Sequence, residues 1–201
     1  MCGLWGYVGR RDEAHADVIR EVLKLASRRG PDAFGVWCDG ALWRGAGRAS
    51  FEMVDIHAAV MLGHARLATV LGTKRPEHGQ PVQCADIVLA HNGSVWNSRE
   101  LPEAANVTTG CDSELLAACL AAESGALPDR LARARSRVDL GEHFALAAYQ
   151  VASGVLLAAR GQSLYMLEDV SGLYWCSVRP DEHWTAVTRP AFHSLLRGSE
   201  K

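Results

Sequence analysis

The sequence lacks the features that would direct the protein to a membrane or to nucleic acid. Its 201 residues contain 21 lysines and arginines against 23 aspartates and glutamates, a formal net charge of -2. This balance provides no strong positive field for nucleic acid or an anionic membrane surface. No apolar run is long enough to span a bilayer, and the N-terminus does not have the pattern of a signal peptide. We therefore expect a cytosolic protein that binds neither nucleic acid nor membrane.

The sequence also lacks the cysteine spacing of a metal site. Its six cysteines stand at positions 2, 38, 84, 111, 119 and 176, with no C-x-x-C pair and no histidine at a zinc-ligand spacing. A structural zinc is therefore not expected. The thiols should be reduced in the cytosol. We expect neither a metal nor another cofactor.

The length and the patterning predict one α+β domain over residues 1–201. No repeat, low-complexity tract or linker divides the chain. Runs typical of strands lie at Leu4 to Val8, Val60 to Leu67, Ile87 to His91, Phe144 to Val151, Val155 to Ala159, Leu164 to Leu167 and Leu173 to Val178, and Phe34 to Gly47 reads as a hairpin that turns at Asp39-Gly40. Helices are predicted at Ala14 to Ala26, Asp112 to Glu123 and Pro128 to Arg137, with a further short helix within Arg189 to Lys201. Strands, then helices, then a meander of strands favour layered and largely antiparallel sheets.

The most informative single position is Cys2, directly after the initiator methionine. A small second residue permits removal of Met1, which leaves a thiol beside a free α-amine. An α-amine has a pKa near 8, so a usable fraction is neutral at pH 7 and can accept the thiol proton. Taken alone, Cys2 is better interpreted as a small buried residue at the start of a strand.

Six motifs in order over the first 115 residues make the functional reading specific. They are M-C-G-L-W-G at residues 1–6, R-G-P-D-A-F-G at 29–35, G-H-A-R-L-A-T at 63–69, Q-P-V at 80–82, H-N-G-S-V-W-N at 91–97 and T-G-C-D-S-E at 109–114. This set resembles the class II glutamine amidotransferase domains, which are N-terminal-nucleophile hydrolases. The motifs are most similar to the glutaminase half of asparagine synthetases, and Thr69 is typical of the glucosamine-phosphate synthase type. The resemblance implies a sandwich of largely antiparallel sheets flanked by helices.

The resemblance implies that glutamine is held at its amino-acid end and attacked by Cys2. Arg66, aided by Thr69, is the candidate to bind the α-carboxylate, a bidentate task that lysine does not reproduce. An exposed ion pair is the structural alternative for Arg66. Asp112 is the candidate for the α-ammonium, although it could also, or instead, cap the helix that follows.

The same resemblance assigns the oxyanion donors to the side chain of Asn92 and the backbone N–H of Gly93. Taken alone, Asn-Gly more often marks a hairpin turn. The Arg29–Gly35 motif reads as a turn that packs near the nucleophile rather than as a catalytic element. His64 and His91 are expected to be packed core residues and stay outside the catalytic set.

These assignments predict an enzyme that hydrolyses glutamine to glutamate and ammonia. Family members usually carry a synthase domain as well, so we expect a synthase or ligase on a separate chain to use the ammonia. With Met1 in place the amine of Cys2 is an amide, and that form should be inactive. The alternatives are a free-standing hydrolase of γ-glutamyl amides or peptides, and a glutamine-binding subunit without turnover.

Overall fold

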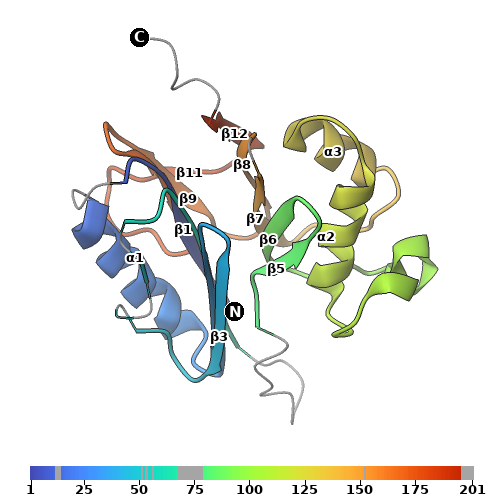
Figure 1. The fold of residues 1–201 in the computed structure, drawn as a ribbon, viewed down its shortest axis with the longest axis horizontal. Coiled ribbons are helices and arrows are strands. Elements are labelled where there is room, and N and C mark those ends of the chain that lie inside the picture. The colour runs from blue at the N-terminus through green and yellow to red at the C-terminus, as the bar shows by residue number, and fades with distance from the viewer. Residues whose placement is uncertain are drawn as a thin grey trace. The chain divides into compact units, whose positions relative to one another are not determined.

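The computed structural model describes residues 1–11, 15–50, 52, 54–55, 57–67, 79–151 and 153–195. The chain forms two compact units, each built on one sheet (Figure 1). The first unit comprises residues 1–81 and 163–187, and the second comprises 82–162 and 188–201. Whether both belong to one domain over 1–201 stays a prediction.

The first unit contains a seven-stranded sheet in the order β11-β9-β10-β1-β4-β2-β3. Its strands are β1 (Gly3–Gly9), β2 (Ala33–Cys38), β3 (Ala41–Ala46), β4 (Val60–Arg66), β9 (Tyr165–Glu168), β10 (Gly172–Cys176) and β11 (Thr185–Ala186), and every pair is antiparallel. Strand β1 lies between β4 and β10, and six of its seven residues are buried. The N-terminal strand therefore belongs to the interior of its sheet, not to an edge.

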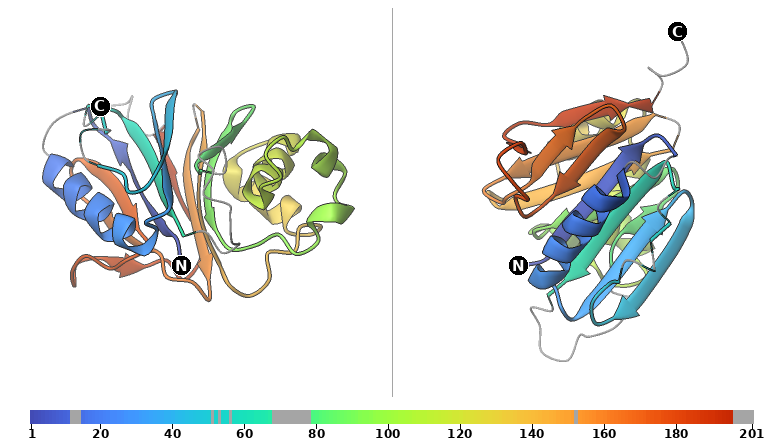
Figure 2. Two further views of the ribbon diagram at one scale, coloured as in Figure 1. Left: turned by 90° about the horizontal axis from the view of Figure 1, so that it is seen from below. Right: turned by 90° about the vertical axis from the view of Figure 1, so that its left-hand side faces the viewer.

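Helix α1 (Ala16–Arg29) covers one face of this sheet (Figure 2). Its buried side chains include Ile19, Val22 and Leu23, which recur on one face at helical spacing. The helix approaches β1 closely, because a Cβ added to Gly3 would lie only 2.0 Å from the carbonyl oxygen of Ala26. Glycine beside Cys2 thus allows α1 to pack directly on β1.

The second unit contains a five-stranded antiparallel sheet in the order β12-β8-β7-β6-β5. Its strands are β5 (Val82–Cys84), β6 (Ile87–Asn92), β7 (Phe144–Gln150), β8 (Gly154–Arg160) and β12 (Ala191–Ser194). Helix α2 (Asp112–Ala122) contacts β5 and β6, and α3 (Leu127–Ala134) contacts β7 and β8. Two short 3-10 helices, Ser98–Glu100 and Pro102–Asn106, connect β6 toward α2. Leucines of α2 and α3 form the core of this unit together with Ile87, Leu89 and Leu146 of the sheet.

Most sequence predictions of the fold are confirmed. The α+β class, the antiparallel sheets, the main helices and the hairpin are present, and the hairpin turns at Asp39 (φ 43°) and Gly40 (φ 102°). Helix α1 continues to Arg29, three residues beyond the predicted end, and α3 ends at Ala134 rather than near Arg137.

One prediction is wrong. Residues 191–194, within the segment predicted as a C-terminal helix, form β12 and pair with β8 from Ala191 opposite Leu157 to Ser194 opposite Gly154. The hydrogen bonds offered by the open edge of β8 outweigh the weak helical pattern of a four-residue run.

No helix among the described residues is both long and apolar enough to cross a membrane.

Candidate active site

The Cys2 thiol lies at the start of the buried strand β1. It is held by the backbone of Leu67, the residue that follows β4. The N–H of Leu67 donates to Cys2 Sγ at 3.3 Å, and the thiol donates to the Leu67 carbonyl oxygen at 3.7 Å. Cys2 is only partly buried, whereas Cys38, Cys119 and Cys176 are buried. All six cysteines lie in the described ranges and have free thiols. Cys2 is therefore both anchored and accessible.

The Arg29 side chain supports this end of the strand, as predicted for the R-G-P-D motif. Its guanidinium donates to the Ser177 carbonyl oxygen at 2.6 Å and to Met1 Sδ at 3.2 Å. Ser177 in turn exchanges bonds with Leu4, whose N–H donates to Ser177 Oγ at 3.0 Å. Sequence reasoning placed the motif near Cys2 but missed Ser177, because nothing in the local pattern of that serine links it to Leu4 and Arg29, which lie 173 and 148 positions away.

Arg66 is the last residue of β4 and lies beside Cys2. Ala65 pairs with Gly3, so Arg66 is one step further along the same two strands, level with Cys2. The Arg66 carbonyl oxygen accepts the N–H of Asp32 at 3.1 Å, which fixes the backbone here. The Arg66 side chain is half-buried. Thr69, predicted to share its task, lies outside the described residues.

Asn92 ends strand β6 of the second unit, and Gly93 follows it. Asn92 is 5% exposed and pairs with Ala145 of β7. Gly93 has φ 147°, and an added Cβ would lie 2.6 Å from His91 Nε2. The hairpin alternative is wrong, because β6 pairs with β5 and β7 and the chain beyond Gly93 enters 3-10 helices. A side-chain amide and a glycine N–H stand together at a strand end, as an oxyanion site needs.

Asp112 is the first residue of α2. Its Oδ2 accepts the N–H of Val95 at 2.9 Å, and Cys111 Sγ lies 3.9 Å from its Oδ1. The N-cap is Cys111, which makes no side-chain capping bond. The capping alternative is therefore not what the structure shows. Asp112 instead ties the loop after Asn92-Gly93 to the helix.

Glu114 and Asn97 hold the loops on either side of this site, and sequence reasoning assigned a role to neither. Glu114 accepts four hydrogen bonds of 2.6 to 3.1 Å, from the N–H and the hydroxyl of Thr108 and of Thr109. Burial raises the pKa of Glu114, but the hydrogen bonds from the two threonines lower it by more than burial raises it. The pKa of Glu114 therefore lies below its ordinary value. The sequence did contain a signal for this role. Glu114 is the third residue of α2, a position where a glutamate side chain often turns back to bind unpaired backbone N–H groups before the helix.

Asn97, the last residue of the H-N-G-S-V-W-N motif, binds a distant segment of the same unit. Its Nδ2 donates to the Arg137 carbonyl oxygen at 2.7 Å, and its Oδ1 accepts the N–H of Asp139 at 2.9 Å. The Trp96 N–H also donates to the Asp139 carbonyl oxygen. The loop after Gly93 is thus fixed at Val95, Trp96 and Asn97.

Both histidines of the motifs are core residues, as predicted. His64 is 1% exposed and His91 is 2% exposed. Burial lowers the pKa of His91 to about 4, although the nearby Asp112 carboxylate raises it in part. His91 Nδ1 lies 3.3 Å from Ser113 Oγ. A neutral, packed His91 supports Asn92 and Gly93 without titrating near pH 7.

The predicted site residues divide between the two units. Cys2 and Arg66 are neighbours in the first, and Asn92, Gly93 and Asp112 belong to connected segments of the second. Their chemical roles stay predictions. Among the described residues, no cluster of three or more His, Cys, Asp or Glu side chains could hold a metal ion.

Comparisons with solved structures identify the fold. A glutamine phosphoribosylpyrophosphate amidotransferase from B. subtilis, in complex with ADP and GMP, superposes with a TM-score of 0.66 over 88% of this chain and 42% of its own, at 20% identity. A second structure, of an allosteric regulatory enzyme of purine biosynthesis, gives a TM-score of 0.65 over 87% of this chain and 41% of its own. The fold is that of the N-terminal-nucleophile hydrolases.

Curated relatives agree with this class. Glutamine–fructose-6-phosphate aminotransferases from Methanococcus maripaludis and Thermococcus kodakarensis are 29% and 33% identical over 114 and 113 residues. Each match covers 51% of this chain but only 18% of the relative's length. No protein-family model matches the chain. These relatives and the fold support a class II glutamine amidotransferase domain in this chain and are consistent with enzyme activity. Its closer likeness to asparagine synthetases stays a prediction.

Proposed function

We propose that this chain hydrolyses glutamine to glutamate and ammonia with Cys2 as nucleophile. The observation that carries the proposal is the position of the thiol: it is partly exposed at the head of a central buried strand, bonded to Leu67 and level with Arg66. Cys84 and Cys111 are partly buried as well, but Cys2 directly follows Met1 and lies level with Arg66. The class of the domain supports the same chemistry.

The reaction has two balanced steps. Cys2 Sγ attacks the side-chain amide carbon of glutamine, its proton passes to the departing nitrogen, and the C–N bond breaks to release ammonia and leave a thioester. Water then attacks the thioester, which yields glutamate and restores the thiol. Each step passes through a tetrahedral oxyanion, for which Asn92 Nδ2 and the Gly93 N–H are the proposed donors.

The substrate is held by opposite charges at its amino-acid end. The Arg66 guanidinium binds the α-carboxylate, and one Asp112 oxygen binds the α-ammonium. Asp112 suits this task because Oδ2 is already fixed by the Val95 N–H at 2.9 Å, so the carboxylate is oriented before glutamine arrives. The bond also links the ammonium-binding carboxylate to the loop that carries the oxyanion donors.

The base is the α-amine of Cys2, which becomes free when Met1 is removed. Met1 is 73% exposed, so the bond to be cut is reachable. The Met1 contact with Arg29 would be replaced by water. The unprocessed chain should be inactive.

We further propose that the ammonia passes to a synthase, here a separate chain. In support, the relatives' names describe transfer of glutamine nitrogen to a second substrate. A closed route would keep the ammonia unprotonated and nucleophilic.

The test is a glutaminase assay on processed protein, with Cys2→Ala and Cys111→Ala compared. We expect Cys2→Ala to abolish glutamate formation and Cys111→Ala to keep most of it. Faster hydrolysis of γ-glutamyl peptides than of glutamine would identify a γ-glutamyl hydrolase instead. Tight glutamine binding with no turnover, in wild-type protein lacking Met1, would contradict catalysis.

A further inference from the structure

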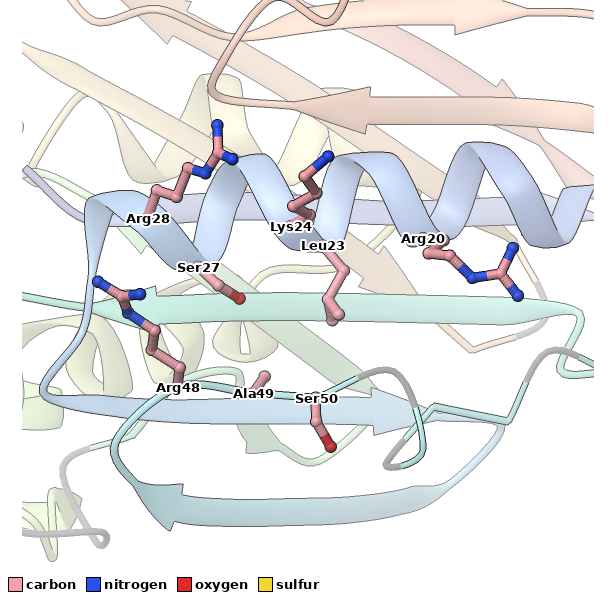
Figure 3. Close-up of a pocket in the computed structure, with 8 residues that line it drawn as sticks. All are labelled: Arg20, Leu23, Lys24, Ser27, Arg28, Arg48, Ala49 and Ser50. Atoms are coloured by element: carbon pink, nitrogen blue, oxygen red, sulfur yellow. The ribbon is translucent and has the colours of Figure 1, made fainter.

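A basic cavity of about 300 Å³ lies between α1 and the segment that follows β3 in the first unit (Figure 3). Four of its lining residues are cations: Arg20, Lys24 and Arg28 from the helix, and Arg48 from the segment. None of them belongs to the six motifs that point to glutamine chemistry. The cavity therefore needs its own explanation.

The cations at one end of the cavity are paired with carboxylates, and those at the other end are not. Arg20 pairs with Asp17 at 2.5 Å, and Lys24 pairs with Glu21 at 3.4 Å. Arg28 and Arg48 make no ion pair and no hydrogen bond with any described residue. Two guanidinium groups therefore line one cavity with no carboxylate bound to either, an arrangement that an anion would stabilise.

A buried hydroxyl opens onto the same cavity. Ser27 is 6% exposed, and its Oγ has no hydrogen-bond partner among the described residues. Figure 3 shows Ser27 pointing from α1 toward the segment of Arg48 and Ser50, and Arg48 reaching toward the end of the helix. A buried polar group without a partner is costly, so such groups mark sites where a ligand or water completes the bonding.

We propose that this cavity binds the phosphate group of a small phosphorylated metabolite. The Arg48 guanidinium supplies paired N–H donors that match phosphate oxygens, and the Ser27 hydroxyl supplies a further donor from inside the protein. The Arg28 guanidinium, which Figure 3 shows directed to the other side of α1, adds positive charge beside them. A cavity of this size accommodates a phosphate with a few attached carbons.

The dipole of α1 accounts for only one of the groups at this end of the cavity. Its negative end favours a cation in the last helical turn and so accounts for Arg28, but not for Arg48 or Ser27.

The cavity is also linked to the nucleophile through α1. The residue before Ser27, Ala26, packs its carbonyl oxygen against Gly3, and the residue after Arg28, Arg29, contacts Met1 and Ser177. A phosphate that fixes the last turn of α1 would therefore fix the backbone around Cys2. The proposed phosphate site does not rest on the proposed glutaminase activity. Phosphate binding can be measured without glutamine, so either proposal can fail while the other holds.

The test is isothermal titration calorimetry with inorganic phosphate and with glycerol 3-phosphate, at an ionic strength kept constant with chloride. Glycerol is the matched control ligand. We expect saturable binding of both phosphates and none of glycerol. Arg28→Gln and Arg48→Gln should each weaken binding by about tenfold to a hundredfold. Arg10→Gln and Arg99→Gln, which remove the same charge from exposed positions elsewhere, should leave it unchanged.

Ser27→Ala separates a ligand site from a packing defect. Without phosphate this variant should melt at the same temperature as wild type or higher, because it removes an unpaired buried hydroxyl. With phosphate, wild type should gain more in Tm than the variant. The proposal is wrong if neither phosphate binds, if the Arg10 and Arg99 variants lose as much affinity as the cavity variants, or if a glutamate-rich peptide binds the cavity arginines more tightly than glycerol 3-phosphate does.

Discussion

Replacing Gly93 with alanine tests whether its backbone N–H is an oxyanion donor. At φ 147° an alanine is strained, at a cost of about 1 to 3 kcal/mol in the free energy of unfolding. The new Cβ would also lie 2.6 Å from His91 Nε2 and 3.1 Å from Phe144 Cβ, and both side chains are buried. Since neither neighbour has room to move, the Gly93 backbone must shift and carry its N–H away from the oxyanion.

The expected result is a fall in kcat of about a hundredfold or more, the usual cost of one lost donor, with a smaller change in KM. Gly125→Ala is the matched control, because its φ is 89° but the nearest atom to an added Cβ is 3.6 Å away. Both variants should lose several degrees in Tm, roughly 2 to 4 °C for each kcal/mol in a chain of this size.

The assay combines steady-state release of glutamate with thermal unfolding of both variants. Strain alone would reduce Tm in both without a specific kinetic effect. If Gly93→Ala were destabilised like Gly125→Ala but kept kcat within about twofold of wild type, the oxyanion assignment would be refuted.

Three further predictions concern other residues of the candidate site. Arg66→Lys and Asp112→Asn should each raise KM for glutamine by tenfold or more, on the order of one charge-assisted bond, in steady-state kinetics; an unchanged KM would remove these residues from substrate binding. Glu114→Gln should lower the free energy of unfolding at pH 7, and the difference from wild type should shrink as pH falls below about 4.5, because the lowered pKa of Glu114 stabilises the fold only while the carboxylate is charged. His91 has a folded-state pKa of about 4 against an ordinary 6.5, so the unfolded chain takes up the proton first and stability falls as pH drops through this window. In urea titrations, the free energy of unfolding of His91→Asn should fall less than that of wild type between pH 6.5 and 4. An equal fall in both proteins would mean that the folded state does not lower the pKa of His91.

The elements that could be predicted from sequence are those whose pattern is local. Helix α2 and strand β6 each present long apolar runs, and the Asp39-Gly40 turn needs only two residues with positive φ. Strand β12 has four residues and depends on the exposed edge of β8, which lies more than 30 positions earlier in the chain. A short segment takes the structure of its partner, and the partner is not visible in its own pattern.

The same distinction applies to the site. Cys2, Arg66 and Asn92 could be found because they belong to short motifs, and their position at strand ends is a local property. The Val95 bond to Asp112 joins residues 17 positions apart, and the cavity between Ser27 and Arg48 joins two elements. Such contacts depend on tertiary packing and are not encoded in any one motif.

The most direct test of the central claim is covalent capture of the nucleophile. The processed protein is treated with a glutamine analogue that carries an electrophilic ketone in place of the side-chain amide, and the adduct is located by peptide mass spectrometry. We predict one adduct per chain, on a peptide that begins at Cys2 and lacks Met1, with glutaminase activity lost in proportion and glutamine protecting against both. An adduct on Cys84 or Cys111, or full activity in protein that retains Met1, would contradict the assignment of Cys2 as an N-terminal nucleophile.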